Sequence, residues 1–170
     1  MRITSRSIVL AGCIIALAAC GDESKGPTAL LVPTLSSEWG PETPPFNLEV
    51  VLSGDGFGLV KFRQPNDNAL IINLDTWVRG LEANTAYILQ RAADTNLDGN
   101  CSSTSWLTLG KGLVPQTITT DARGTGRESL FRNVAALGVG ATFDITFRVV
   151  NVATSAVVLT SDCYRYTISQ

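Results

Sequence analysis

Residues 69–80 read ALIINLDTWVRG, with apolar and polar side chains alternating along most of the stretch. One set of alternate residues is Leu70, Ile72, Leu74, Thr76 and Val78. The other set is Asn73, Asp75, Trp77 and Arg79. Because successive side chains of a β-strand point to opposite faces, the pattern predicts a strand with a buried face and a polar face.

Residues 143–148 repeat this alternation. Phe143, Ile145 and Phe147 are expected to face the core, and Asp144, Thr146 and Arg148 to face out. Similar short runs, rich in β-branched and aromatic residues, continue from NLEVVL (47–52) to CYRYTI (163–168). Turn sequences such as PNDN and DARGTG separate them, and no segment keeps helical periodicity. Strands in this arrangement indicate a single sandwich or barrel domain over residues 46–170.

The first twenty residues, MRITSRSIVLAGCIIALAAC, have the composition of a secretory signal. Arg2 and Arg6 form a basic start, and a short apolar run ending in small residues follows. The run is too short for a stable membrane span, which needs roughly 20 apolar residues. We therefore expect export of the protein.

The end of this segment, Leu17-Ala18-Ala19-Cys20, resembles the lipobox of bacterial lipoproteins. The resemblance implies a signal peptide over residues 1–19 and a lipid on Cys20. The motif ending at Cys13 fits slightly better, but cleavage there would leave about five apolar residues where signals usually have 7–15. Gly21, rather than Asp, follows Cys20. In proteobacterial lipoproteins this implies the outer membrane.

Residues 20–45 are expected to form a tether between the lipid and the domain. They contain five of the seven prolines, and such proline density makes a semi-rigid spacer. After loss of the signal the chain carries eleven basic and fifteen acidic residues, a balance of −4. This balance argues against nucleic acid and anionic lipid surfaces as partners.

The cysteine count predicts one disulfide. Cys13 is lost with the signal and Cys20 is assigned to the lipid, which leaves Cys101 and Cys163. Two remaining cysteines in an exported protein indicate a Cys101–Cys163 bridge. The alternative is two free buried thiols.

Two stretches resemble known sandwich domains. GLEANTAY (80–87) resembles the tyrosine corner of fibronectin-type and immunoglobulin-like domains, in which the hydroxyl, here of Tyr87, bonds back to the chain. The strand AYILQRA, the loop DTNLDGNCSS, the turn ITTDARGTG and a near-terminal Cys together resemble copper–zinc superoxide dismutases. Both resemblances imply an all-β fold, a single Greek-key β-sandwich of immunoglobulin-like or superoxide dismutase-like type. The second also implies the same disulfide.

Enzymatic chemistry is not expected. The chain has no histidine, so the metal ligands of the dismutase family are missing and that activity is not carried over. Histidine-based triads and the commonest general base are excluded as well. No nucleophile elbow, phosphate loop or dinucleotide fingerprint is present. A hydrolase that uses a pair of carboxylates is the alternative.

Trp77 is the best candidate for a binding residue. The alternation places it on the polar face with Asn73, Asp75 and Arg79. An indole beside amide, carboxylate and guanidinium groups suits a carbohydrate or a protein partner. The alternative is that Trp77 is covered as ordinary packing. The predicted function is a lipid-anchored, non-catalytic binding module of the cell envelope.

Residues 94–101, DTNLDGNC, match the opening of a calcium loop. The ligands would be Asp94, Asn96, Asp98 and the Asn100 carbonyl. The twelfth position is Ser105, which cannot supply the bidentate carboxylate of a complete loop. We therefore predict a structural loop of Asx-turns and no cofactor, with calcium binding as the alternative.

Overall fold

The computed structural model describes residues 48–169. Predictions for the signal segment, the lipid on Cys20 and the tether lie outside the described residues. In the described part the chain is all-β, as predicted, with a single short 3₁₀ helix, η1 (Ala135–Leu137). Over these residues no helix is both long and apolar enough to cross a membrane.

The described residues form twelve strands, and each of the four stretches named in the sequence analysis contributes to one of them. They are β1 (Leu48–Gly54), β2 (Phe57–Arg63), β3 (Ile71–Arg79), β4 (Ala86–Asp94), β5 (Leu107–Thr108), β6 (Gly110–Lys111), β7 (Val114–Pro115), β8 (Ile118–Thr119), β9 (Gly126–Asn133), β10 (Thr142–Asn151), β11 (Val157–Ser161) and β12 (Tyr164–Thr167).

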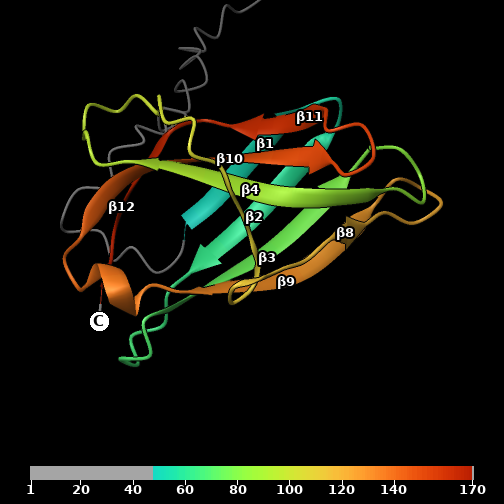
Figure 1. Ribbon diagram of the computed structural model, residues 1–170. Helices are drawn as coiled ribbons and strands as arrows, with labels where there is room; N and C mark the ends of the chain where they lie inside the picture. Colours follow the sequence, from blue (N-terminus) through green and yellow to red (C-terminus); the bar gives the residue numbers. More distant parts are fainter. Residues whose placement is uncertain (1–47, 170) are drawn as a thin grey trace, which may run out of the picture. The chain divides into compact units, whose positions relative to one another are not determined.

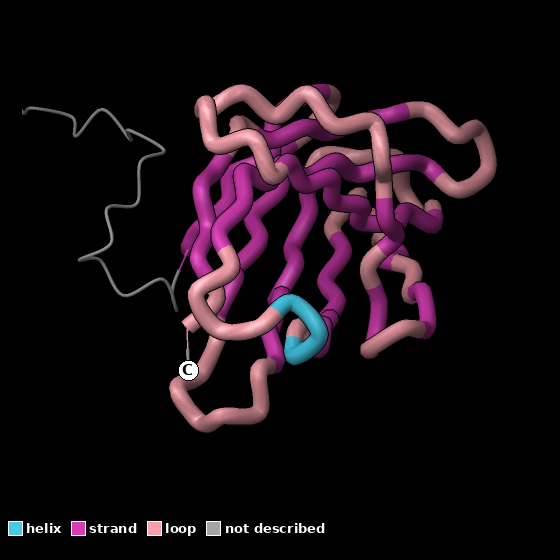
Figure 2. Tube along the Cα trace, turned by 60° about the vertical axis from the view of Figure 1, so that its left-hand side comes forward, coloured by secondary structure: helices cyan, strands magenta, loops and turns pink. Residues whose placement is uncertain are grey.

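The strands form a nearly closed sandwich (Figures 1 and 2). One layer contains β1, β2, β3 and β9, paired in that order. The other layer contains β4 and β10, with β12 paired to β10. On one side β11 pairs with both β10 and β1 and so connects the layers. On the other side β8 pairs with β4, and a bridge between Thr120 and Gly126 links the end of β8 to β9.

This pairing is a Greek key, which confirms the predicted fold class. Strands β4, β8 and β9 follow one another in space, and after residues 134–141 the chain returns to the other layer, where β10 pairs with β4. That order defines the motif. The sandwich therefore brings residues of β4 and β10 next to each other although they are far apart in sequence, as in the pairing of Asp94 with Asp144, which are 50 residues apart.

The core lies between the two layers and follows the alternation seen in the sequence. Ile72, Leu74 and Val78 on β3 are buried, and Thr76 between them is fully buried. The aromatic centre is Phe62, which contacts Phe147 and Tyr166 edge-on. Leu70 lies just before β3 and is only partly buried.

Asp144, Thr146 and Arg148 lie on the outward side of β10, as predicted, but none of them is fully exposed. Asp144 is 1% exposed, and the other two side chains are half-buried. The long connection after β4 crosses the outward side of β4 and β10. There the Gly99 amide donates to Asp144, and the ring of Trp106 lies 3.9 Å from the Arg148 guanidinium. Strand periodicity identifies the two faces of β10 but carries no information about a distant loop that covers one of them.

The predicted tyrosine corner is present. The hydroxyl of buried Tyr87 accepts a hydrogen bond of 3.1 Å from the Glu82 amide. The Thr120 hydroxyl donates to the Glu82 carbonyl at 2.6 Å, which ties the ITTDARGTG turn to this corner. Gly124 in that turn has φ +72°, and a Cβ there would lie 2.0 Å from the Leu81 carbonyl oxygen. The two motifs noted in the sequence therefore form a single packed corner.

Candidate functional site

Trp77 belongs to an aromatic–arginine cluster on the outward side of β2 and β3. Its half-buried indole meets Phe57 edge-on, with ring centroids 6.0 Å apart. The exposed Arg79 guanidinium lies 5.3 Å from the Trp77 ring and 5.0 Å from the Phe57 ring. Both guanidinium distances lie within the range of cation–π attraction, which favours this arrangement of the three side chains.

The other predicted binding residues lie further along the same face. Asn73 pairs with Arg63, and Asp75 pairs with Lys61, across β2 and β3. Asp75 accepts 2.9 Å and 2.7 Å hydrogen bonds from Ser129 and Arg63. The Ser129 hydroxyl, followed by the Arg63 guanidinium, lowers the pKa of Asp75 although partial burial opposes this. The structure thus brings all four predicted residues to one face, with Trp77 and Arg79 at one end.

We call this surface the outer face. It is defined by the outward residues of β1, β2, β3 and β9, including Val51, Lys61, Trp77, Arg127 and Phe131. Val51 is 41% and Phe131 is 37% exposed, so apolar surface extends beyond the cluster. Arginine, tryptophan and phenylalanine are among the residue types that are enriched in protein–protein interfaces.

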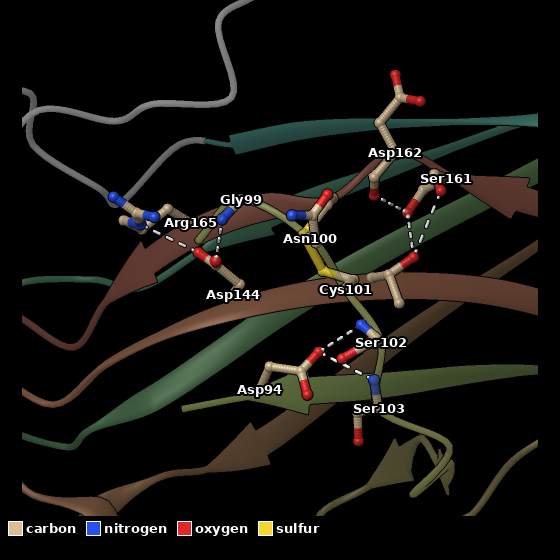
Figure 3. Close-up of a disulfide and its surroundings, with 12 residues drawn as sticks. Asp94, Gly99, Asn100, Cys101, Ser102, Ser103, Asp144, Ser161, Asp162 and Arg165 are labelled. Atoms are coloured by element: carbon tan, nitrogen blue, oxygen red, sulfur yellow. Dashed lines mark hydrogen bonds and ion pairs between the residues drawn. A yellow bond between two sulfur atoms is a disulfide. The ribbon is translucent and has the colours of Figure 1, made fainter. Parts of the chain in front are cut away.

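The predicted disulfide is confirmed. Cys101 and Cys163 are joined with an S–S distance of 2.08 Å and a Cα–Cα distance of 5.4 Å (Figure 3). The bridge fastens the loop after β4 to the segment between β11 and β12. It closes a 62-residue separation, which in the chain-entropy model stabilises the fold by about 4 kcal/mol.

The four proposed calcium ligands form hydrogen bonds within this loop. Asp94 Oδ2 accepts amide bonds from Ser102 and Ser103 at 2.8 and 3.0 Å. Asp98 accepts from the Asn96 side chain at 2.6 Å and from the Asn100 amide at 2.9 Å. Within residues 48–169 there is no group of three or more Asp, Glu, His or Cys that could hold a metal. The contact between Asp98 and the Asn100 amide is a predicted Asx-turn, whereas Asp94 bonds amides eight and nine residues away. Calcium binding stays the alternative.

Asp144 organises the same loop, a role the sequence did not suggest. Its Oδ2 accepts the Gly99 amide at 2.8 Å and its Oδ1 accepts the Arg165 Nε at 3.0 Å (Figure 3). Arg165 also donates to the Leu97 carbonyl at 2.7 Å. Asp94 and Asp144 are direct cross-strand neighbours on β4 and β10. Both acids are engaged by backbone amides, which is a structural arrangement.

A cavity of about 280 Å³ opens into the core between the two layers. Its walls are mainly apolar and include Phe62, Ile72, Leu74, Leu109, Phe143 and Phe147. Two arginines, Arg91 and Arg132, also line it. The sequence analysis singled out neither arginine. A signal was present for Arg91, because it alternates along β4 with Tyr87 and Leu89, which are buried.

No known protein-family model matches this chain, and no curated protein matches it significantly.

Proposed function

We propose that the protein is a lipid-anchored, non-catalytic module of the cell envelope that binds a protein or carbohydrate partner through its outer face. The observation that carries the proposal is the Trp77–Phe57–Arg79 cluster. Trp and Arg dominate binding energy at interfaces when they are clustered and surrounded by less critical polar contacts. The Arg63–Asp75 and Lys61–Glu49 ion pairs supply such a polar surround.

The cluster also suits a carbohydrate. Sugars stack on aromatic rings while amide, carboxylate and guanidinium groups bind their hydroxyls. Asn73 and Asp75 supply those polar groups on the same strand as Trp77. A flat sugar ring and a protein side chain would therefore use the same residues.

The binding test compares partner capture by the wild-type chain, Trp77→Ala and a matched control, Val152→Ala. Val152 is 47% exposed in the turn between β10 and β11, away from the outer face. We expect Trp77→Ala to lose capture at least tenfold and Val152→Ala to keep it. Equal capture by both variants, or a loss from Trp77→Ala that merely follows unfolding in a thermal melt, would contradict the proposal.

The anchor is proposed on the lipobox resemblance around Cys20, and the oxidised Cys101–Cys163 pair supports export because such bridges persist outside the reducing cytosol. Cys20→Ser should abolish membrane attachment, and Cys13→Ser should leave it intact. Mass spectrometry of the mature N-terminus measures this directly. A mature chain beginning at Cys13, or an unlipidated one, would overturn the assignment.

The superoxide dismutase-like resemblance is likewise proposed only for the fold. It is supported by the Greek key, the Asp121 turn and the bridge from the β4–β5 loop to the C-terminal strands. Without histidine the site chemistry of that family has no ligands to use. The proposal of a non-catalytic protein rests on this composition and on the structural roles of Asp94 and Asp144.

A further inference from the structure

The cavity exists because the sandwich closes incompletely between β4 and β9. The two-residue strand β8 pairs with β4 only at Ala86 and Tyr87, and its end meets β9 only at Gly126. Further along, β5 pairs with β4 at Gln90 and Arg91, and β6 meets β9 at Phe131. Beyond those pairs, no described strand bridges the ends of β4 and β9. The core is accessible from this gap.

Both arginines of the cavity point inward from opposite layers. Arg91 is opposite Phe147 on β10, and Arg132 is opposite Ile72 on β3; Phe147 and Ile72 are core residues. Directly opposite residues of paired strands share a face, so each guanidinium lies on the core side of its strand. A charged group on the inner face of a sandwich is costly unless a counter-charge accompanies it.

The described residues do not supply that counter-charge to Arg91. They make no hydrogen bond or ion pair with its guanidinium. Glu128, the acid on the inner side of β9, is paired with Lys111 at 2.9 Å. Asp94 also lines the cavity, but its Oδ2 accepts two backbone amides. Burial, with repulsion from Arg132, lowers the pKa of Arg91. Arg132 itself donates to the Gly112 carbonyl at 3.2 Å.

We propose that this cavity binds a small amphipathic carboxylate, with its apolar body against Phe62, Ile72 and Phe143 and its carboxylate on Arg91 and Arg132. Guanidinium groups bind carboxylates through paired, charge-assisted hydrogen bonds, which gain strength in an apolar setting. Two arginines against one acid give the lining a net positive charge, which selects an anion. The ligand supplies the counter-charge that residues 48–169 do not give to Arg91.

The cavity volume sets the ligand size. About 280 Å³ corresponds to roughly nine water molecules at about 30 Å³ each. A carboxylate with a straight chain of about eight carbons fills that space, so octanoate is a suitable probe. Octanol and octylamine have the same chain with a neutral or positive head and serve as matched ligands.

The test is calorimetric titration of the oxidised whole chain carrying Cys20→Ser, so that no lipid or detergent competes. We expect saturable one-to-one binding of octanoate, with octanol at least tenfold weaker and octylamine weaker still. Arg91→Gln and Arg132→Gln should each weaken octanoate binding about tenfold, and Ala93→Leu, which fills the cavity, should abolish it. Arg127→Gln removes the same charge from the outer face and should leave binding unchanged.

Thermal melts of the free variants separate a binding role from a structural one. Because Arg91 is inward and has no ion-pair partner among residues 48–169, Arg91→Gln should keep or raise Tm. The proposal would be overturned if octanoate did not bind, or if octanol and octylamine bound as tightly as octanoate. It would also be overturned if Ala93→Leu and both arginine variants left octanoate binding unchanged. A lower Tm of Arg91→Gln would overturn the role given to that residue. Trp77→Ala should bind octanoate normally, so failure at the cavity and failure at the outer face are distinguishable.

Discussion

Replacing Asp144 by Ala should destabilise the domain by about 3 kcal/mol. Asp144 is 1% exposed and makes two charge-assisted hydrogen bonds, to the Gly99 amide and to Arg165. Each such bond contributes about 1.5–3 kcal/mol, and breaking a buried ion pair by removing one partner costs about 3–5 kcal/mol. The Arg165 side chain is 23% exposed and can rehydrate, so we expect the lower end of the range.

The assay is urea unfolding of the oxidised protein, followed by tryptophan fluorescence. With a slope of about 1–3 kcal/mol per molar urea, the loss should move the midpoint by about 1–3 M. Asp144→Asn keeps an acceptor for Gly99 and should lose less. The matched control is Asp75→Ala, because Asp75 forms a surface pair with half-exposed Arg63 and such pairs contribute about 0–1 kcal/mol. Equal midpoints for Asp144→Ala and Asp75→Ala would refute the role given to Asp144.

Three further predictions concern the loop and the core. Reduction of the Cys101–Cys163 bridge should lower stability by about 4 kcal/mol, and native thiol labelling of both cysteines before reduction would contradict its presence. Thermal melts in excess calcium and in chelator should coincide, because we expect no calcium to bind. Calcium at 100 times Kd would stabilise the protein by about 2.7 kcal/mol. A large rise in Tm with calcium that is lost in Asp94→Ala would establish a calcium site. Burial raises the pKa of all three tyrosines, which favours their neutral form in the folded protein. The free energy of unfolding should therefore be maintained below about pH 10 and fall as the pH rises above that value. Absorbance titration should show tyrosine ionisation together with unfolding, and ionisation of all three in folded protein near pH 10 would be the contrary result.

The local features of the fold were predictable because local chemistry determines them. Alternation along residues 71–79 identified the buried side of β3, and the cysteine count identified the bridge. The GLEANTAY stretch carried the tyrosine corner because the acceptor, Tyr87, and its donor, Glu82, lie within five residues. Each of these signals needs only short stretches of sequence or a count of residues.

Features that depend on distant segments were not predictable in the same way. Asp144 occupies an outward strand position, and only the disulfide-fastened loop makes that position a buried one. Arg91 occupies an inward position, but its accessibility depends on how far β8, β5 and β6 close the sandwich. Strand periodicity predicts which side of the sheet a side chain faces, but it does not predict which distant segments cover that side chain.

The most direct test of the outer face as a binding surface is photo-crosslinking from Phe131. Phe131 is 37% exposed on β9 and lies on the outer face opposite Asn73. Replacing it with benzoylphenylalanine keeps an aromatic side chain at that position, and the same replacement at Val152 is the control. Irradiation of cells should give a discrete crosslinked product from position 131 that is absent from position 152 and is lost when Trp77→Ala is added. Identical products from both positions, or a product from position 131 that survives Trp77→Ala, would contradict the account.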